Sequence, residues 1–222
     1  MTKPLRKAVE AIAEVISPKK KVLEIGSLLV RNQSALANMR GMFGESEYVG
    51  IDMRSGSGVD RVVNAEQLPF PDGSFDLVLC LEVLEHAEKP WVVAGEIERV
   101  LKTDGVAIVS SQQNFPIHNH PSDYFRYTPF GMRSLFSKLK SNLVFGIGEE
   151  FGNLVSKNPE HVILVGSKSK SAKLSKIRRV LMSREKEISV HKPYRHRLQT
   201  IVELVKRIVW EVDYKLKVFF FK

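Results

Sequence analysis

The sequence has 222 residues, enough for one sizeable α/β domain with an appendage. Hydrophobic residues make up 43% of it, which excludes disorder throughout, and its single cysteine, Cys80, excludes a disulfide framework. The net charge of +9 is uneven: residues 168–222 carry 16 Lys and Arg against 5 Asp and Glu, whereas residues 1–167 carry 18 against 20, so a broad nucleic-acid groove is not expected on the body.

The chain begins with a charged amphipathic segment, residues 4–16, whose apolar residues recur at helical spacing. It lacks the continuous apolar core of a signal peptide, and no stretch approaches the roughly 18 apolar residues of a membrane span. A lone cysteine in an apolar run fits a reducing compartment. We therefore expect a cytoplasmic protein.

Short apolar runs of the buried-strand type follow, with turn residues between them. They span residues 21–25, 48–52, 60–63, 75–81 and 105–109, with a helix predicted over 91–101. Strands that alternate with helices at this spacing indicate βαβ units and a mainly parallel sheet. Two later strands, 143–147 and 161–165, predict an antiparallel hairpin at the sheet edge.

The last quarter of the chain is expected to be separate from the body. Residues 167–175 read as a Lys/Ser-rich linker, which divides a domain over 1–167 from a basic helical extension over 168–222. Helices are predicted over 176–188 and 197–216, and the second is strongly amphipathic. We expect this helix to pack on the domain or on a second copy of the chain. The alternative is peripheral contact with an anionic membrane surface. Three acidic residues within the helix weaken both anionic partners, membrane and nucleic acid, and nucleic acid is the less favoured of the two.

The strand ends predict a nucleoside-cofactor site, since ligands of parallel sheets bind at the carboxyl ends of the strands. Glu24 and Gly26 end the first strand, and Gly26 permits a sharp turn. Asp52 ends the second, where a carboxylate can accept hydrogen bonds from the ribose hydroxyls. Asn64 and the Ala65 amide follow the third and can recognise an adenine edge. Together they predict a nucleoside-cofactor domain over about residues 22–109.

Four segments resemble a known family. VLEIGS, YVGIDM, NAEQLPFPDGSFDLVLCLEVLEH and RVLKTDGVAIVSS are similar to the successive motifs of class I S-adenosylmethionine-dependent methyltransferases of the small-molecule type. The resemblance implies a Rossmann-like, seven-stranded, mostly parallel sheet with helices on both faces and a C-terminal antiparallel hairpin. It implies S-adenosylmethionine as cofactor, held by Glu24, Gly26, Asp52, Asn64, Ala65, Leu81 and Glu82, with their neighbours Ser27, Met53 and Glu66.

The glycine turn departs from the family pattern. Gly-x-Gly-x-Gly reads Gly26-Ser-Leu-Leu-Val30 here, and the acid on the adenine side is Asn64. A pyrophosphate must lie against such a loop in a nicotinamide dehydrogenase, whereas S-adenosylmethionine has no phosphate and tolerates a bulkier turn. The substitutions therefore favour S-adenosylmethionine over a dinucleotide.

The segment after the fifth strand, residues 110–129, is dense in polar and aromatic side chains. His118 and His120 are candidate general bases, and Asp123 is a third catalytic candidate that could orient one of them. The residues expected to bind the acceptor are His86, Tyr124, Arg126 and Tyr127. The structural alternative is that Asp123, Tyr124 and Arg126 only fasten the loop ahead of a helix that Thr128 caps and Pro129 begins. No metal is expected, because no Cys/His cluster has zinc spacing.

The expected function is therefore methyl transfer from S-adenosylmethionine to a small molecule, a glycan or a lipid-linked metabolite, at oxygen. Two alternatives remain at this point. One is an RNA or protein methyltransferase recruited by the basic tail. The other is a catalytically silent, cofactor-binding subunit, which the altered glycine turn suggests.

Overall fold

The computed structural model describes residues 1–16, 21–30, 34–118, 122–147, 159–170 and 172–188. All of them belong to one compact unit, Met1–Val190. The helix expected over 197–216 lies outside the described residues. Within the described part of the chain, no helix is long and apolar enough to cross a membrane.

Seven strands form one sheet in the order β3-β2-β1-β4-β5-β7-β6. β1 to β5 pair in parallel, whereas β7 is antiparallel to both β5 and β6. The expected mostly parallel sheet with a terminal hairpin is confirmed. The strands are β1 Lys21–Ile25, β2 Glu47–Asp52, β3 Arg61–Val62, β4 Phe75–Leu81, β5 Leu101–Gln112, β6 Ser141–Ile147 and β7 His161–Ser167.

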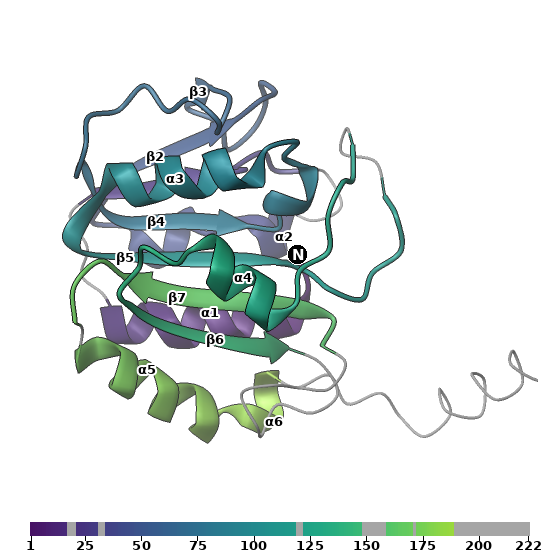
Figure 1. Cartoon of the computed structure of the whole chain (residues 1–222). Helices are drawn as coiled ribbons and strands as arrows, with labels where there is room; N and C mark the ends of the chain where they lie inside the picture. Colours follow the sequence, from purple (N-terminus) through teal and green to yellow (C-terminus); the bar gives the residue numbers. More distant parts are fainter. Residues whose placement is uncertain (17–20, 31–33, 119–121, 148–158, 171, 189–222) are drawn as a thin grey trace, which may run out of the picture. The chain divides into compact units, whose positions relative to one another are not determined.

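Helices cover both faces of the sheet, with α3 and α4 on the near side in Figure 1 and α1 on the far side. The far face also packs α5 and α6, whose Leu174, Ile177, Leu181 and Ile188 are buried with α1. The first part of the segment assigned to the extension thus packs on the body. The helices are α1 Lys3–Ile16, α2 Ser34–Ala37, α3 Pro90–Val100, α4 Pro129–Leu135, α5 Ala172–Ser183 and α6 Glu185–Ile188, with short 3₁₀ turns η1 Arg40–Phe43 and η2 Leu84–His86.

Element boundaries differ from the expectations where pairing extends a strand or a turn interrupts a helix. β5 was expected over 105–109 but runs from Leu101 to Gln112, because it pairs with β4 from Phe75 onward and with β7 as far as His161. The helix expected over 176–188 begins earlier, at Ala172, and breaks at Arg184 into α5 and α6. The predicted cap of α4 is confirmed: Thr128 Oγ1 accepts a hydrogen bond from the Gly131 amide at 3.1 Å.

Candidate active site

The carboxyl ends of the strands surround a cavity of about 600 Å³. Its walls come from the turn after β1, the ends of β2 and β4, the segment after β3, and the loop after β5. Nine of the ten predicted cofactor residues line it, namely Glu24, Gly26, Asp52, Met53, Asn64, Ala65, Glu66, Leu81 and Glu82. Ser27 is not among the lining residues, and its side chain is buried close to Gly50.

The turn after β1 is sharp and held by the neighbouring strand. Gly26 has φ +81°, and its amide and that of Ser27 both donate to the Ile51 carbonyl, at 2.8 and 3.0 Å. A Cβ on Gly26 would overlap the Val83 side chain, so only glycine fits. Leu28 lines the cavity where the family pattern has glycine, so the wall there is apolar.

Asp52 projects from the end of β2 between two loops. Its Oδ1 accepts from the Arg54 amide at 3.0 Å and its Oδ2 faces the Leu28 amide at 3.4 Å. The carboxylate is mostly buried but lines the cavity. Each oxygen keeps a further lone pair for a ligand hydroxyl, which suits a ribose.

Glu24 also lines the cavity, and it forms a hydrogen bond with Tyr48. The Tyr48 hydroxyl donates to Glu24 Oε2 at 2.7 Å. Burial raises the pKa of Glu24 to about 7, although the Tyr48 hydrogen bond lowers it in part. Glu24 can therefore change charge near neutral pH, inside the cavity.

The segment after β3 forms a compact turn that also lines the cavity. We call this turn, the turn after β1 and the end of β2 the cofactor wall. Asn64 Oδ1 accepts from the Glu66 amide at 2.9 Å, and the Asn64 carbonyl accepts from the Gln67 amide at 3.0 Å. This turn fixes the Asn64 side chain while leaving its NH₂ group to donate. Asn64 and Ala65 both line the cavity, as expected.

Glu82 and His161 form a buried pair, of which only Glu82 was predicted from the sequence. Glu82 has φ +57°, a rare value for a residue with a Cβ. Its carboxylate accepts from Ser110 Oγ at 2.8 Å and from His161 Nδ1 at 2.9 Å. Burial raises the pKa of Glu82, but the His161 charge and these hydrogen bonds outweigh it, so the net shift is downward. His161 also lines the cavity, where the pairing of β7 with β5 places it, and this long-range contact has no local signal in the sequence.

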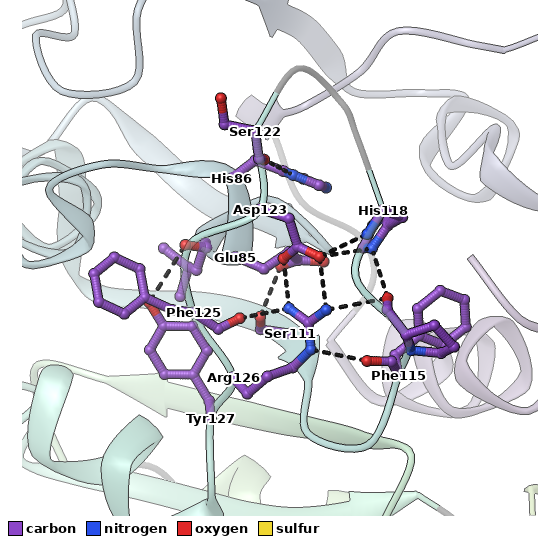
Figure 2. Close-up of polar contacts among 12 residues, drawn as sticks. Glu85, His86, Ser111, Phe115, His118, Ser122, Asp123, Phe125, Arg126 and Tyr127 are labelled. Carbon is purple, nitrogen blue, oxygen red and sulfur yellow. Dashed lines mark hydrogen bonds and ion pairs between the residues drawn. The ribbon is translucent and has the colours of Figure 1, made fainter. Parts of the chain in front are cut away.

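The loop after β5 is organised by an ion pair (Figure 2). Arg126 binds both oxygens of Asp123, whose side chain is only 1% exposed, and donates to the carbonyls of Phe115 and Pro116. Hydrogen bonds from Arg126 hold the pKa of Asp123 well below its usual range, against the effect of burial. Asp123 Oδ2 in turn faces His118 Nδ1 at 3.1 Å and accepts from the His118 amide at 2.9 Å. Asp123 thus orients His118, which lines the cavity.

The predicted acceptor-binding residues divide into two groups. His86 and Tyr124 line the cavity, whereas Arg126 and Tyr127 are not among the lining residues. Arg126 is engaged with Asp123, and the buried Tyr127 hydroxyl donates to the Leu84 carbonyl at 3.3 Å. Of the three residues in the structural alternative, Asp123 and Arg126 form the ion pair that fastens the loop, whereas Tyr124 lines the cavity. His120, the other candidate base, lies outside the described residues.

Glu85 fastens this loop to the end of β4. Its carbonyl accepts from the amides of Tyr124 and Phe125, and Ser111 Oγ donates to its Oε2 at 2.7 Å. Burial and the charge of Glu82 raise the pKa of Glu85. His86, the next residue, stacks edge-to-face with His118 at 4.8 Å between ring centroids. Two segments far apart in sequence thus form one wall, which we call the acceptor wall.

Known proteins resemble this chain over the cofactor half of the domain. Residues 23–109 match the sequence family described as a methyltransferase domain. An uncharacterized methyltransferase of Mycobacterium sp. (strain JLS) is 34% identical over 111 residues, which cover 46% of this chain and 42% of the relative. The 27-O-demethylrifamycin SV methyltransferase of Amycolatopsis mediterranei is 46% identical over 50 residues, 21% of this chain and 18% of that protein. The chain therefore spans less than half the length of these curated relatives.

The fold is also found in solved structures. The 1,6-didemethyltoxoflavin-N1-methyltransferase of Burkholderia thailandensis, solved with 1,6-didemethyltoxoflavin and S-adenosylhomocysteine, has a TM-score of 0.53. The match covers 75% of this chain and 79% of that one at 13% identity. At 13% identity, the match shows that the two proteins share a fold and nothing more.

Proposed function

We propose that the chain, whose residues 23–109 match a methyltransferase domain, is an S-adenosylmethionine-dependent methyltransferase that acts on a hydroxyl oxygen of a small molecule, a glycan or a lipid-linked metabolite. One observation carries the proposal: residues suited to the cofactor and the oriented His118 line the same cavity. An acceptor beside His118 and a cofactor on Asp52 would share one cavity.

The reaction itself needs few groups. The acceptor oxygen attacks the methyl carbon in line, the carbon–sulfur bond breaks with its electron pair going to sulfur, and S-adenosylhomocysteine leaves. The hydroxyl proton must be lost, and we assign this step to the acceptor wall at His118, with Asp123 as the residue that positions it. A neutral amine can attack before it loses a proton, whereas a hydroxyl gains most from a base, so the oriented imidazole favours oxygen. The A. mediterranei relative, by its name, acts in O-methylation.

The test uses S-adenosylmethionine labelled in its methyl group, the full chain, and a host extract separated into metabolites, RNA and protein. We expect label in the metabolite fraction and at least a hundredfold lower rate for His118→Gln, a loss typical of removing an acid–base group. Cofactor binding by calorimetry should be unchanged in His118→Gln, which serves as its own folding control. Label in RNA or protein would contradict the proposed acceptor class, and cofactor binding without transfer would indicate a silent subunit.

The basic tail remains a separate proposal. Residues 168–222 carry 16 Lys and Arg against 5 Asp and Glu, a composition that favours peripheral contact with an anionic membrane over a neutral one. The full chain should sediment with vesicles containing anionic lipid, less with neutral vesicles, and less at high salt. Equal sedimentation with both would contradict it and leave self-association of the tail as the better hypothesis.

A further inference from the structure

The acceptor wall holds three side chains of the kind that bind transition metals. Glu85, His86 and His118 each place one ligand atom within 4.8 Å of the others. Two imidazoles and a carboxylate suit Zn²⁺ and leave at least one coordination position open. All three residues line the cavity. Sequence spacing gave no sign of this group, because the first two residues follow β4 and the third follows β5.

Both imidazoles are held in the tautomer that a metal requires. His86 Nδ1 lies 2.5 Å from the Ser122 carbonyl oxygen, and His118 Nδ1 lies 3.1 Å from Asp123 Oδ2. A carbonyl and an ionised carboxylate only accept hydrogen bonds, so each Nδ1 carries the proton. Each Nε2 then carries a lone pair. Histidine ligands of metals are typically oriented in this way, by a carbonyl or a carboxylate on the other ring nitrogen.

Glu85 supplies a buried oxygen that has no hydrogen-bond donor among the described residues. The residue is 0% exposed, and its Oε2 accepts from Ser111. Its Oε1 has no hydrogen-bond partner within the described part of the chain. A buried polar atom without a partner is costly and calls for an explanation, and a bound cation is one.

We propose that Glu85, His86 and His118 form a binding site for a single Zn²⁺ ion at the acceptor end of the cavity. Zinc lies about 2.1 Å from nitrogen and oxygen ligands, which places tetrahedral ligands roughly 3.4 Å apart. The three side chains therefore close by about 1 to 1.5 Å when the ion binds.

The role of the ion rests on the proposed function, although its binding does not. The three residues line the cavity, so an acceptor hydroxyl there could supply the fourth ligand. A bound Zn²⁺ would lower the pKa of that hydroxyl, whose proton would pass to water, and the oxygen would then attack the methyl carbon as the carbon–sulfur bond breaks. In this arrangement His118 acts as a metal ligand instead of as the base assigned above, and Asp123 still fixes its orientation.

The test measures metal binding directly, in the full chain dialysed against a chelator. Calorimetry with Zn²⁺ and the visible absorption of Co²⁺ should both report a site in the wild type. Glu85→Gln and His118→Gln should each weaken Zn²⁺ binding about 100-fold or more, the upper end of the loss when even an outer partner is removed. Glu88→Gln is the matched control, because it makes the same charge change on an exposed residue of the same cavity and should bind normally.

These experiments test Zn²⁺ binding separately from methyl transfer. Wild-type protein without Zn²⁺ affinity, or Glu85→Gln with unaltered affinity, would overturn the site. Methyl transfer that survives chelation and Glu85→Gln but is lost in His118→Gln would overturn the role of the metal in the reaction, and would make His118 a metal-free base. A Zn²⁺ site that is lost in both variants, in a protein without methyl transfer, would support the site and contradict the proposed function instead.

Discussion

The two walls of the cavity are built in different ways. The cofactor wall is fixed by the backbone: parallel pairing of β1 with β2 places Gly26 and Asp52 side by side, and two amides of the turn bind the Ile51 carbonyl. The acceptor wall is fixed by side chains, through Asp123 with Arg126 and through Ser111 with Glu85. Single substitutions should therefore disturb the acceptor wall as a unit, whereas those on the cofactor wall should act locally.

The largest effect is expected for Arg126→Met. It leaves the buried carboxylate of Asp123 without its arginine partner, which should cost about 3 to 5 kcal/mol of stability. Asp123 orients His118 and is itself held by Arg126, so His118 should shift and turnover should fall by about 100-fold, as expected when a reacting group is misplaced. Denaturant unfolding and kcat are the measurements, and the affinity for S-adenosylmethionine should stay within about twofold.

The control for that experiment removes both charges. Asp123→Asn combined with Arg126→Met should recover part of the stability, because no unpaired charge stays buried. Activity should not recover, since His118 has lost its carboxylate. A double variant that regains activity would show that the ion pair is only a structural fastener.

A smaller effect is expected for Asp52→Ala on the cofactor wall. It removes a carboxylate that can accept two ribose hydrogen bonds, so the Kd for S-adenosylmethionine should rise roughly 10- to 100-fold. The effect should be local, with little change in kcat at saturating cofactor. Calorimetry measures it, with Asp72→Ala as a control on an exposed turn residue. Equal loss of affinity in both variants would contradict the assignment of Asp52.

The difference between the walls also explains what the sequence could predict. Strand composition and turn residues are local, so the sheet, the hairpin and the cavity position of Asp52 and Asn64 could be predicted from them. Ser27 stays a prediction: its side chain lies close to Gly50 and is not among the lining residues. The partners Asp123–Arg126 are three residues apart and were anticipated only as an alternative to a catalytic role.

Long-range partners could not be predicted in the same way. His161 meets Glu82 because β7 inserts beside β5, and the sequence contains no local sign of that contact. His86 meets His118 because Glu85 binds the backbone of the loop after β5. Such contacts depend on the tertiary fold, and they are concentrated in the acceptor wall.

Gly26→Ala tests whether the first turn tolerates change. The new Cβ would overlap Val83, and φ +81° is unfavourable for alanine by about 1 to 2 kcal/mol. We expect about that loss of stability and a Kd for S-adenosylmethionine roughly tenfold higher, since 1.4 kcal/mol corresponds to a factor of ten. Gly95→Ala in α3 is the control, because its Cβ meets nothing within 4 Å and alanine favours the helix. A tolerant Gly26→Ala variant would mean that the turn, already altered at Leu28, has lost its role in binding.

The smallest effect is a pH dependence of cofactor binding through Glu24. Burial raises its pKa from 4.5 to about 7, so the side chain is mostly neutral at pH 6 and mostly ionised at pH 8. S-adenosylmethionine carries a positive sulfonium, so its affinity should increase about five- to tenfold across that range as the carboxylate forms.

The stability of the free protein should change in the opposite direction. The folded state holds the proton more tightly than the unfolded state, so the stabilisation present below pH 4.5 is lost as the pH rises through 7. Glu24→Gln should remove the pH dependence of the cofactor affinity, measured by calorimetry, and that of the stability, measured by denaturant unfolding. If the affinity of Glu24→Gln still rises with pH, the titrating group lies elsewhere, and the acceptor wall with its raised Glu85 is where it should be sought.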